Sequence, residues 1–187
     1  MTSRPAAPSA LAELNAADEA AFAALAGPLF EQAPRFLARL AAARPFENRD
    51  ALFSHARQIA MSMPADEQRE LVDAHPRIGA APATVSALSF REQGYVADAA
   101  AAAANARRAD VGKVQSELER LNAAYERRFG FRFVVFVAGR PRSEIIPVME
   151  RRLRRAAKAE LATALNEVVA IAEDRWRVLH GGEEAAR

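Results

Sequence analysis

Three short stretches of the sequence combine polar side chains with rigid turn residues, which suits them to chemistry. The first is His75-Pro76-Arg77-Ile78-Gly79, where a histidine stands at a predicted helix end and a proline fixes the backbone beside it. An imidazole titrates close to neutral pH, so His75 can accept and return a proton. A histidine at a helix C-terminus can also simply stabilise the helix macrodipole.

A second stretch, Ser89-Phe90-Arg91-Glu92-Gln93, has the spacing of a helix N-terminus. Ser89 as the N-cap and Glu92 three residues later form a capping box, in which each side chain bonds a free backbone N–H group. A helix N-terminus also attracts anions, so the same residues suit a binding site. A third stretch, Arg128-Phe129-Gly130-Phe131, joins an arginine to a glycine turn. Taken one at a time, each stretch is explained most simply by a structural role.

These stretches lie at the ends of predicted helices. The pattern predicts a helix that ends at His75-Pro76, a loop over 77–89 and a helix over about 90–109. A further helix over about 111–129 carries a hydrophobic stripe, and Gly130 should close it as a C-cap.

Residues 131–138, with the sequence FRFVVFVA, form the one strongly strand-like stretch. A lone strand has no partner for its backbone N–H and C=O groups, and leaving such groups buried and unpaired is costly. We therefore expect an extended, buried segment near 131–138 whose free backbone groups can bind a ligand.

The rest of the chain is also helical in pattern. We expect a disordered leader over 1–10, one helical domain over 11–180 and a frayed tail over 181–187. Asn15 should cap the first helix and Ser143 the last helical region.

Composition favours an all-α, single-domain helical bundle. Alanine, the strongest helix former, supplies 46 of the 187 residues, and an all-β fold would need many more β-branched strands. The chain has no cysteine, which excludes disulfides, thiolate zinc sites, iron–sulfur clusters and cysteine nucleophiles. It has three histidines, so we do not expect a histidine-rich metal site.

Charge and hydropathy limit the partners. The net charge is +2, and the densest basic stretch, residues 151–155, spreads around more than half of a helix. A solvated helix face is the simpler interpretation, with an anion or nucleic-acid site as the alternative. We find neither an apolar run of about 18 residues nor a secretory leader pattern, so we expect no membrane span and a cytoplasmic protein.

The order of the motifs is more specific than any one of them. Over residues 15–180 the chain resembles the 2-oxo-4-hydroxy-4-carboxy-5-ureidoimidazoline (OHCU) decarboxylase family of urate degradation. The matching residues are Phe30-Glu31, Arg44-Pro45-Phe46, the HPxxG-like His75-Pro76-Arg77-Ile78-Gly79, Ser89-x-x-Glu92-Gln93, the block Leu121-Asn122-x-x-Tyr125-x-x-Arg128-Phe129-Gly130-Phe131-x-Phe133-Val134-Val135, and then Arg152-Leu153 and Glu160.

The resemblance implies an all-helical enzyme without a cofactor, usually a homodimer, that converts OHCU to (S)-allantoin and carbon dioxide. The ring C=N of this substrate can take up the electrons of the breaking bond, which is why no metal or organic cofactor is expected. His75 is implied as the catalytic acid/base and Glu92 as the second catalytic group. The substrate-binding residues implied in the same way are Pro76, Ser89, Phe90, Arg91, Gln93, Phe133, Val134, Val135, Phe136 and Val137.

The chain departs from the family pattern at Arg132, where proline is common, and at Arg155, where asparagine is frequent. Neither is a catalytic motif position. Three alternatives stay open: a decarboxylase or hydrolase of a related ureido or imidazoline compound, a non-enzymatic helical protein that binds acidic partners, and a nucleic-acid binder that uses residues 151–155. The small net charge argues against the last of these.

Overall fold

The computed structural model describes residues 9–80 and 108–184, and these form helices joined by turns and by one extended segment after α8. No strand occurs within those two ranges, which confirms the all-α prediction. The helices are α1 (Ala10–Ala16), α2 (Glu19–Ala26), η1 (Gly27–Leu29), α3 (Pro34–Ala42), α4 (Arg49–Ser62), α5 (Ala65–Asp73), α8 (Arg108–Phe129), η3 (Arg142–Glu144), α9 (Ile145–Arg152) and α10 (Ala157–Glu184).

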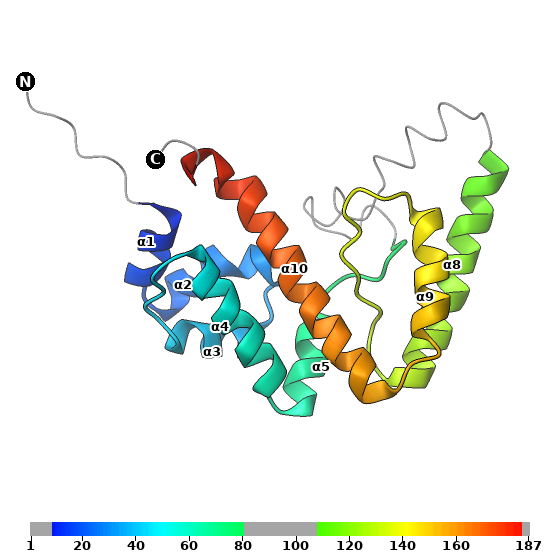
Figure 1. Ribbon diagram of the computed structural model, residues 1–187, viewed down its shortest axis with the longest axis horizontal. Helices are drawn as coiled ribbons and strands as arrows, with labels where there is room; N and C mark the ends of the chain where they lie inside the picture. The colour runs from blue at the N-terminus through cyan, green and yellow to red at the C-terminus, as the bar shows by residue number, and fades with distance from the viewer. Residues whose placement is uncertain (1–8, 81–107, 185–187) are drawn as a thin grey trace, which may run out of the picture.

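The long helix α10 crosses the middle of the molecule (Figure 1). It packs against α4, α5 and η1, while α9 packs against α8. The apolar side chains of α10 at helical spacing, including Leu165, Val168, Ala172 and Trp176, are buried. One hydrophobic core therefore connects the N-terminal helices to α8 and α9 through α10.

Local signals explain where the first helices begin. Ser9 caps α1 by accepting from Ala12 N, and Asp18 caps α2 by accepting from Ala21 N. The prediction that Asn15 caps a helix is wrong, because Asn15 lies inside α1. Its side-chain amide instead exchanges two hydrogen bonds, of 2.8 and 2.9 Å, with the backbone of Phe46.

The C-terminal helical region is divided where the sequence predicted one run. Ser143 lies within η3 and does not cap it, which corrects the prediction for that residue. The chain turns at 153–156 between α9 and α10, because α9 packs on α8 while α10 packs on α4, and one straight helix cannot do both. At the other end α10 continues through Gly181 to Glu184, beyond the expected start of a frayed tail.

The turn after α8 follows the sequence closely. Gly130 has a φ of +73°, which favours glycine, and its N–H donates to Glu126 O at 2.8 Å. Residues 132–137 then run without helix or strand and are drawn in yellow in Figure 1. No helix among the described residues is long and apolar enough to cross a membrane.

Candidate active site

His75 stands at the C-terminal end of α5 and is buried, with 3% of its surface exposed. Its backbone N–H donates to Val72 O, and its Nδ1 lies 3.2 Å from Leu71 O. A carbonyl can only accept, so Nδ1 carries the hydrogen in this contact. Among the described residues Nε2 has no hydrogen-bond partner, which leaves a lone pair for another group.

The surroundings of His75 favour the neutral ring. Burial, together with the nearby guanidinium of Arg175, lowers the pKa of His75 to about 4, although Glu31 and the Leu71 carbonyl oppose the shift. A neutral imidazole gives little stabilisation to a helix macrodipole, so the lowered pKa argues against the interpretation of His75 as a helix-end cation. At neutral pH Nε2 is a base.

His75 opens onto a cavity of about 400 Å³, a volume that includes the solvent at its mouth. The wall residues are His75, Pro76, Ile78, Phe133, Val134, Val135, Phe136, Val137, Ile171 and Arg175. The structure thus brings together the predicted histidine, its proline and all five predicted residues of the extended segment. A mostly apolar pocket with few polar groups is typical of a small-molecule site.

Arg175 is a wall residue that the sequence analysis missed. It lies on α10 with 1% of its surface exposed, and it donates to Pro28 O at 2.8 Å and to Glu31 Oε1 at 2.6 Å. A signal was available in the sequence: Arg175 stands beside Trp176, among apolar residues that recur at helical spacing. An arginine at such a position requires a buried partner, and Glu31 supplies it 144 residues away in the sequence.

The loop that presents Glu31 has an unusual backbone. Glu31 and Gln32 have φ values of +49° and +60°, in the left-handed region that non-glycine residues rarely adopt. The side chain of Gln32 lies against Gly27, where a Cβ atom would come within 2.2 Å of it. Backbone strain of this kind is concentrated at functional sites, and here it places a carboxylate beside Arg175.

Charged side chains hold the extended segment in place of a partner strand. Arg152 Nη1 donates to Val134 O at 2.9 Å, and Glu167 Oε2 accepts from Phe136 N at 2.8 Å. Arg140 donates to Phe136 O and to Val137 O. These bonds satisfy part of the backbone that a lone strand would leave unpaired.

Arg132 connects the extended segment to the turn that carries His75. The backbone N–H of Arg132 donates to Asp73 Oδ1 at 2.7 Å, and its Nη1 donates to Asp73 O and His75 O at 2.6 and 3.1 Å. Proline lacks the N–H group that makes the first of these bonds. The departure from the family pattern at Arg132 therefore adds contacts between the His75 turn and the extended segment.

Five of the predicted site residues belong to the motif at 89–93. Ser89, Phe90, Arg91, Glu92 and Gln93 lie outside the described residues, so their predicted roles stay predictions.

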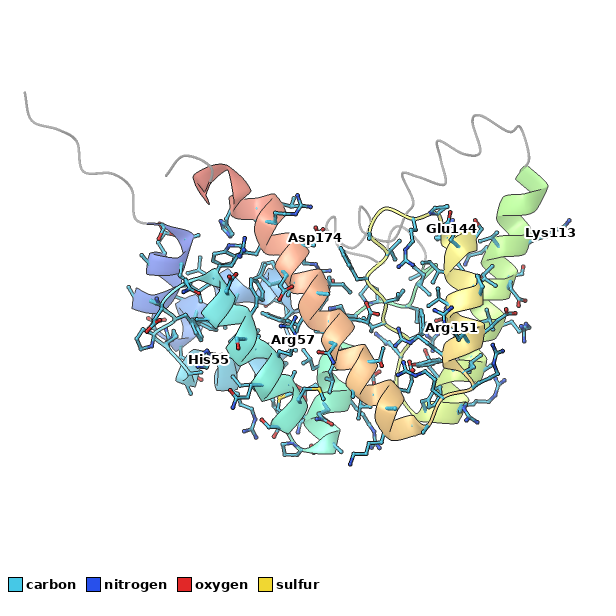
Figure 2. All side chains as sticks on the ribbon, viewed as in Figure 1. His55, Arg57, Lys113, Glu144, Arg151 and Asp174 are labelled. Carbon is cyan, nitrogen blue, oxygen red and sulfur yellow. The ribbon has the colours of Figure 1, made fainter. Side chains whose placement is uncertain are left out.

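The basic stretch at 151–155 is not one charged face: Arg151 is exposed on α9 (Figure 2), whereas Arg152 is 4% exposed and paired with Glu160. Arg155 donates to Thr163 Oγ1 at 2.7 Å. The nucleic-acid alternative thereby loses its main support.

The chain is similar to known proteins of one family. A sequence model of the OHCU decarboxylase family matches residues 15–177. The 2-oxo-4-hydroxy-4-carboxy-5-ureidoimidazoline decarboxylase of Haloferax volcanii is 32% identical over 167 residues, covering 88% of this chain and 92% of the relative. The protein of the same name from Mus musculus is 29% identical, covering 91% of this chain and 93% of the relative.

Solved structures agree on the fold. The crystal structure of an OHCU decarboxylase in the presence of (S)-allantoin superposes with a TM-score of 0.59 at 23% identity, over 83% of this chain and 96% of that one. At this identity the likeness concerns the fold alone. The extent of the family match and the 32% identity establish that the chain belongs to the OHCU decarboxylase family.

Proposed function

We propose that this protein decarboxylates OHCU to (S)-allantoin and carbon dioxide in urate degradation. The observation that carries the proposal is the cavity, where the free Nε2 of a buried, neutral His75 meets the extended segment and Arg175 in a chain of this family. Arg175, which pairs with Glu31, is a wall residue of the same cavity, and a guanidinium is the side-chain group best suited to recognise a carboxylate.

The reaction needs proton transfer but no external electron acceptor. When the bond to carbon dioxide breaks, its electron pair forms a carbon–carbon double bond in the ring, and the pair of the ring C=N moves to nitrogen, which takes a proton. The hydroxyl proton then leaves as the carbonyl forms, and the carbon that bears the ureido group receives a proton on one face. The proton on nitrogen comes from water and is the one proton that the overall reaction consumes. A base that takes up the hydroxyl proton and returns it to that face of the carbon would set the configuration of the product.

We assign the role of this base to His75 Nε2. The Leu71 carbonyl holds the ring, so Nε2 has a fixed direction. Because its pKa lies near 4, the ring is neutral when substrate arrives and can take a proton before it gives one. A protonated imidazole in so buried a place is unstable, which favours rapid return of the proton to the substrate.

Glu92 is proposed as the second catalytic group, with Ser89, Phe90, Arg91 and Gln93 as substrate-binding residues, on the family resemblance alone. Glu92→Gln separates its two possible roles. Glutamine serves well at the third position of a capping box, so an active variant with an unchanged melting temperature would make Glu92 structural. A strong loss of turnover with an unchanged melting temperature would support the catalytic role.

The direct experiment follows freshly generated OHCU by optical activity, with and without the protein. We expect (S)-allantoin to form faster than in buffer, and at the buffer rate when His75→Asn replaces the wild type. Decay at the buffer rate with folded wild-type protein would contradict the proposed function. The homodimer, the cytoplasmic location and catalysis without a cofactor stay predictions, which sedimentation, fractionation and chelation respectively would test.

A further inference from the structure

The extended segment has two edges, and over residues 133–136 only one of them is hydrogen-bonded within the described part of the protein; the other edge is bonded only further on, where Val137 O accepts from Arg140. The bonds from Arg152 and Glu167 reach Val134 O and Phe136 N, which are two residues apart. Among the described residues the backbone of Phe133 and of Val135 makes no hydrogen bond. This alternation is the pattern of an extended chain, whose successive residues point their N–H and C=O groups to opposite edges.

The bonded edge faces a buried ionic network. Arg152 Nε donates to Glu160 Oε1 at 2.5 Å, the Tyr125 hydroxyl donates to the same oxygen, and the guanidinium lies 4.6 Å from the centre of the Phe133 ring. Glu160 is fully buried, so Arg152 has little freedom to move. The position of Val134 is therefore fixed from behind the cavity.

Glu167 extends this support from α10. Its Oε1 lies 3.8 Å from Arg152 Nη1, while its Oε2 accepts from Phe136 N at 2.8 Å. One carboxylate thus joins the arginine that holds Val134 to the amide two residues further on. The residue between them, Val135, belongs to the cavity wall and has its backbone groups on the other edge.

We propose that Glu167 is a positioning residue, which fixes the register of the extended segment so that the free backbone groups of Val135 face a ligand in the cavity. Glu167 is not among the wall residues of the cavity, so it acts through Phe136 and not on the ligand. The identity of the ligand as OHCU rests on the proposed function, whereas the positioning of the segment does not.

Reach and charge at position 167 can be separated by two conservative variants. Glu167→Gln keeps an oxygen at the same distance, which can still accept from Phe136 N, but loses the charge. Glu167→Asp keeps the charge beside Arg152 but is shorter by one methylene and loses the reach. The matched control is Glu173→Asp on the same helix, because Glu173 pairs with Arg57 of α4 at 3.0 Å, away from α9 (Figure 2).

The measurement is the KM and kcat of (S)-allantoin formation. We expect Glu167→Asp to raise KM about 3- to 10-fold, the worth of about one hydrogen bond, with kcat changed less than KM. Glu167→Gln and Glu173→Asp should keep a KM within about twofold of the wild type. A KM for Glu167→Gln equal to or above that of Glu167→Asp overturns the proposal.

Hydrogen exchange of the free protein keeps this test apart from the test of function. Peptides that span 131–138 should exchange faster in Glu167→Asp than in Glu167→Gln, with equal melting temperatures. Equal exchange overturns the positioning role whatever the substrate. If the exchange difference is present but wild-type protein does not make OHCU decay faster than it does in buffer, the result would contradict the proposed function alone.

Discussion

Two buried arginines, Arg175 and Arg152, support two parts of the cavity wall with similar chemistry: the part beside His75 and the extended segment. Each pairs with a glutamate, Glu31 or Glu160, and each donates to backbone carbonyls. The environment differs: Arg175 is part of the cavity wall beside His75, whereas Arg152 lies behind the extended segment over the ring of Phe133. The same ion pair can thus serve a reacting site or a supporting frame, depending on whether a cavity reaches it.

The largest expected effect lies on the Arg175 side and concerns His75 itself. His75→Asn keeps an N–H group that can bond Leu71 O but cannot exchange a proton, so kcat should fall by about 10²–10⁴-fold. The measurement is the initial rate of (S)-allantoin formation, with far-ultraviolet circular dichroism as the check on folding. If a folded variant turned over nearly as fast as the wild type, the Arg175 side of the cavity would have no more chemical role than the Arg152 side.

The second prediction compares the two arginines directly. Removing one partner of a buried ion pair costs about 3–5 kcal/mol, because the other charge is left without compensation. Arg152→Met should lie at the upper end of that range, since the Glu160 side chain is 0% exposed, and Arg175→Met at the lower end, since Glu31 is 16% exposed and water can reach it. Urea unfolding measures both values.

The matched controls are the double variants, Arg152→Met with Glu160→Gln and Arg175→Met with Glu31→Gln. Each should recover part of the lost stability, because neither leaves a buried charge alone. If Arg175→Met proved the more destabilising of the single variants, exposure of the glutamate would not be the deciding factor.

The third prediction concerns the pH dependence of the free energy of unfolding, to which His75 on the Arg175 side should contribute. The folded-state pKa of His75, about 4, lies below its ordinary value of 6.5, so between these values the unfolded chain binds more protons. Stability from this group is complete above pH 6.5 and decreases as the pH falls towards 4, by about 3 kcal/mol in total.

His75→Asn is the reference for this measurement. Carboxylates in ion pairs, such as Asp66 and Glu67, have lowered pKa values and titrate equally in both proteins. The difference between the two unfolding free energies, measured from pH 7 to pH 4.5, therefore reports His75. Parallel curves would mean that burial does not hold the ring neutral.

The smallest effect is expected on the Arg152 side. Burial, together with the hydrogen bond to Glu160, raises the pKa of the Tyr125 hydroxyl, so it stays protonated and donates. Tyr125→Phe should lower the unfolding free energy by about 1 kcal/mol, because Glu160 keeps its bonds from Arg152 and Arg155. Urea unfolding and steady-state kinetics test it together, and kcat should stay within about twofold of the wild type. A large loss of kcat would mean that the Arg152 side of the cavity takes part in the chemistry.

Much of the architecture follows from local sequence. Alanine content and hydrophobic periodicity predict the helices, Gly130 predicts the end of α8, and the lone apolar stretch at 131–138 predicts a segment without a partner strand. These features depend on neighbours along the chain, which is why a sequence shows them. His75 and Pro76 were found in the same way, since a motif is a local pattern.

The tertiary structure alone decided how charges are paired. Glu31 meets Arg175 across 144 residues, and Asp73 meets Arg132 across 59, and no local pattern predicts which carboxylate a buried arginine will find. The same holds for the backbone of the extended segment, whose partners, Arg152 and Glu167, come from two later helices. Burial then sets the protonation of His75, because the cost of removing a charge from water depends on the whole surrounding fold.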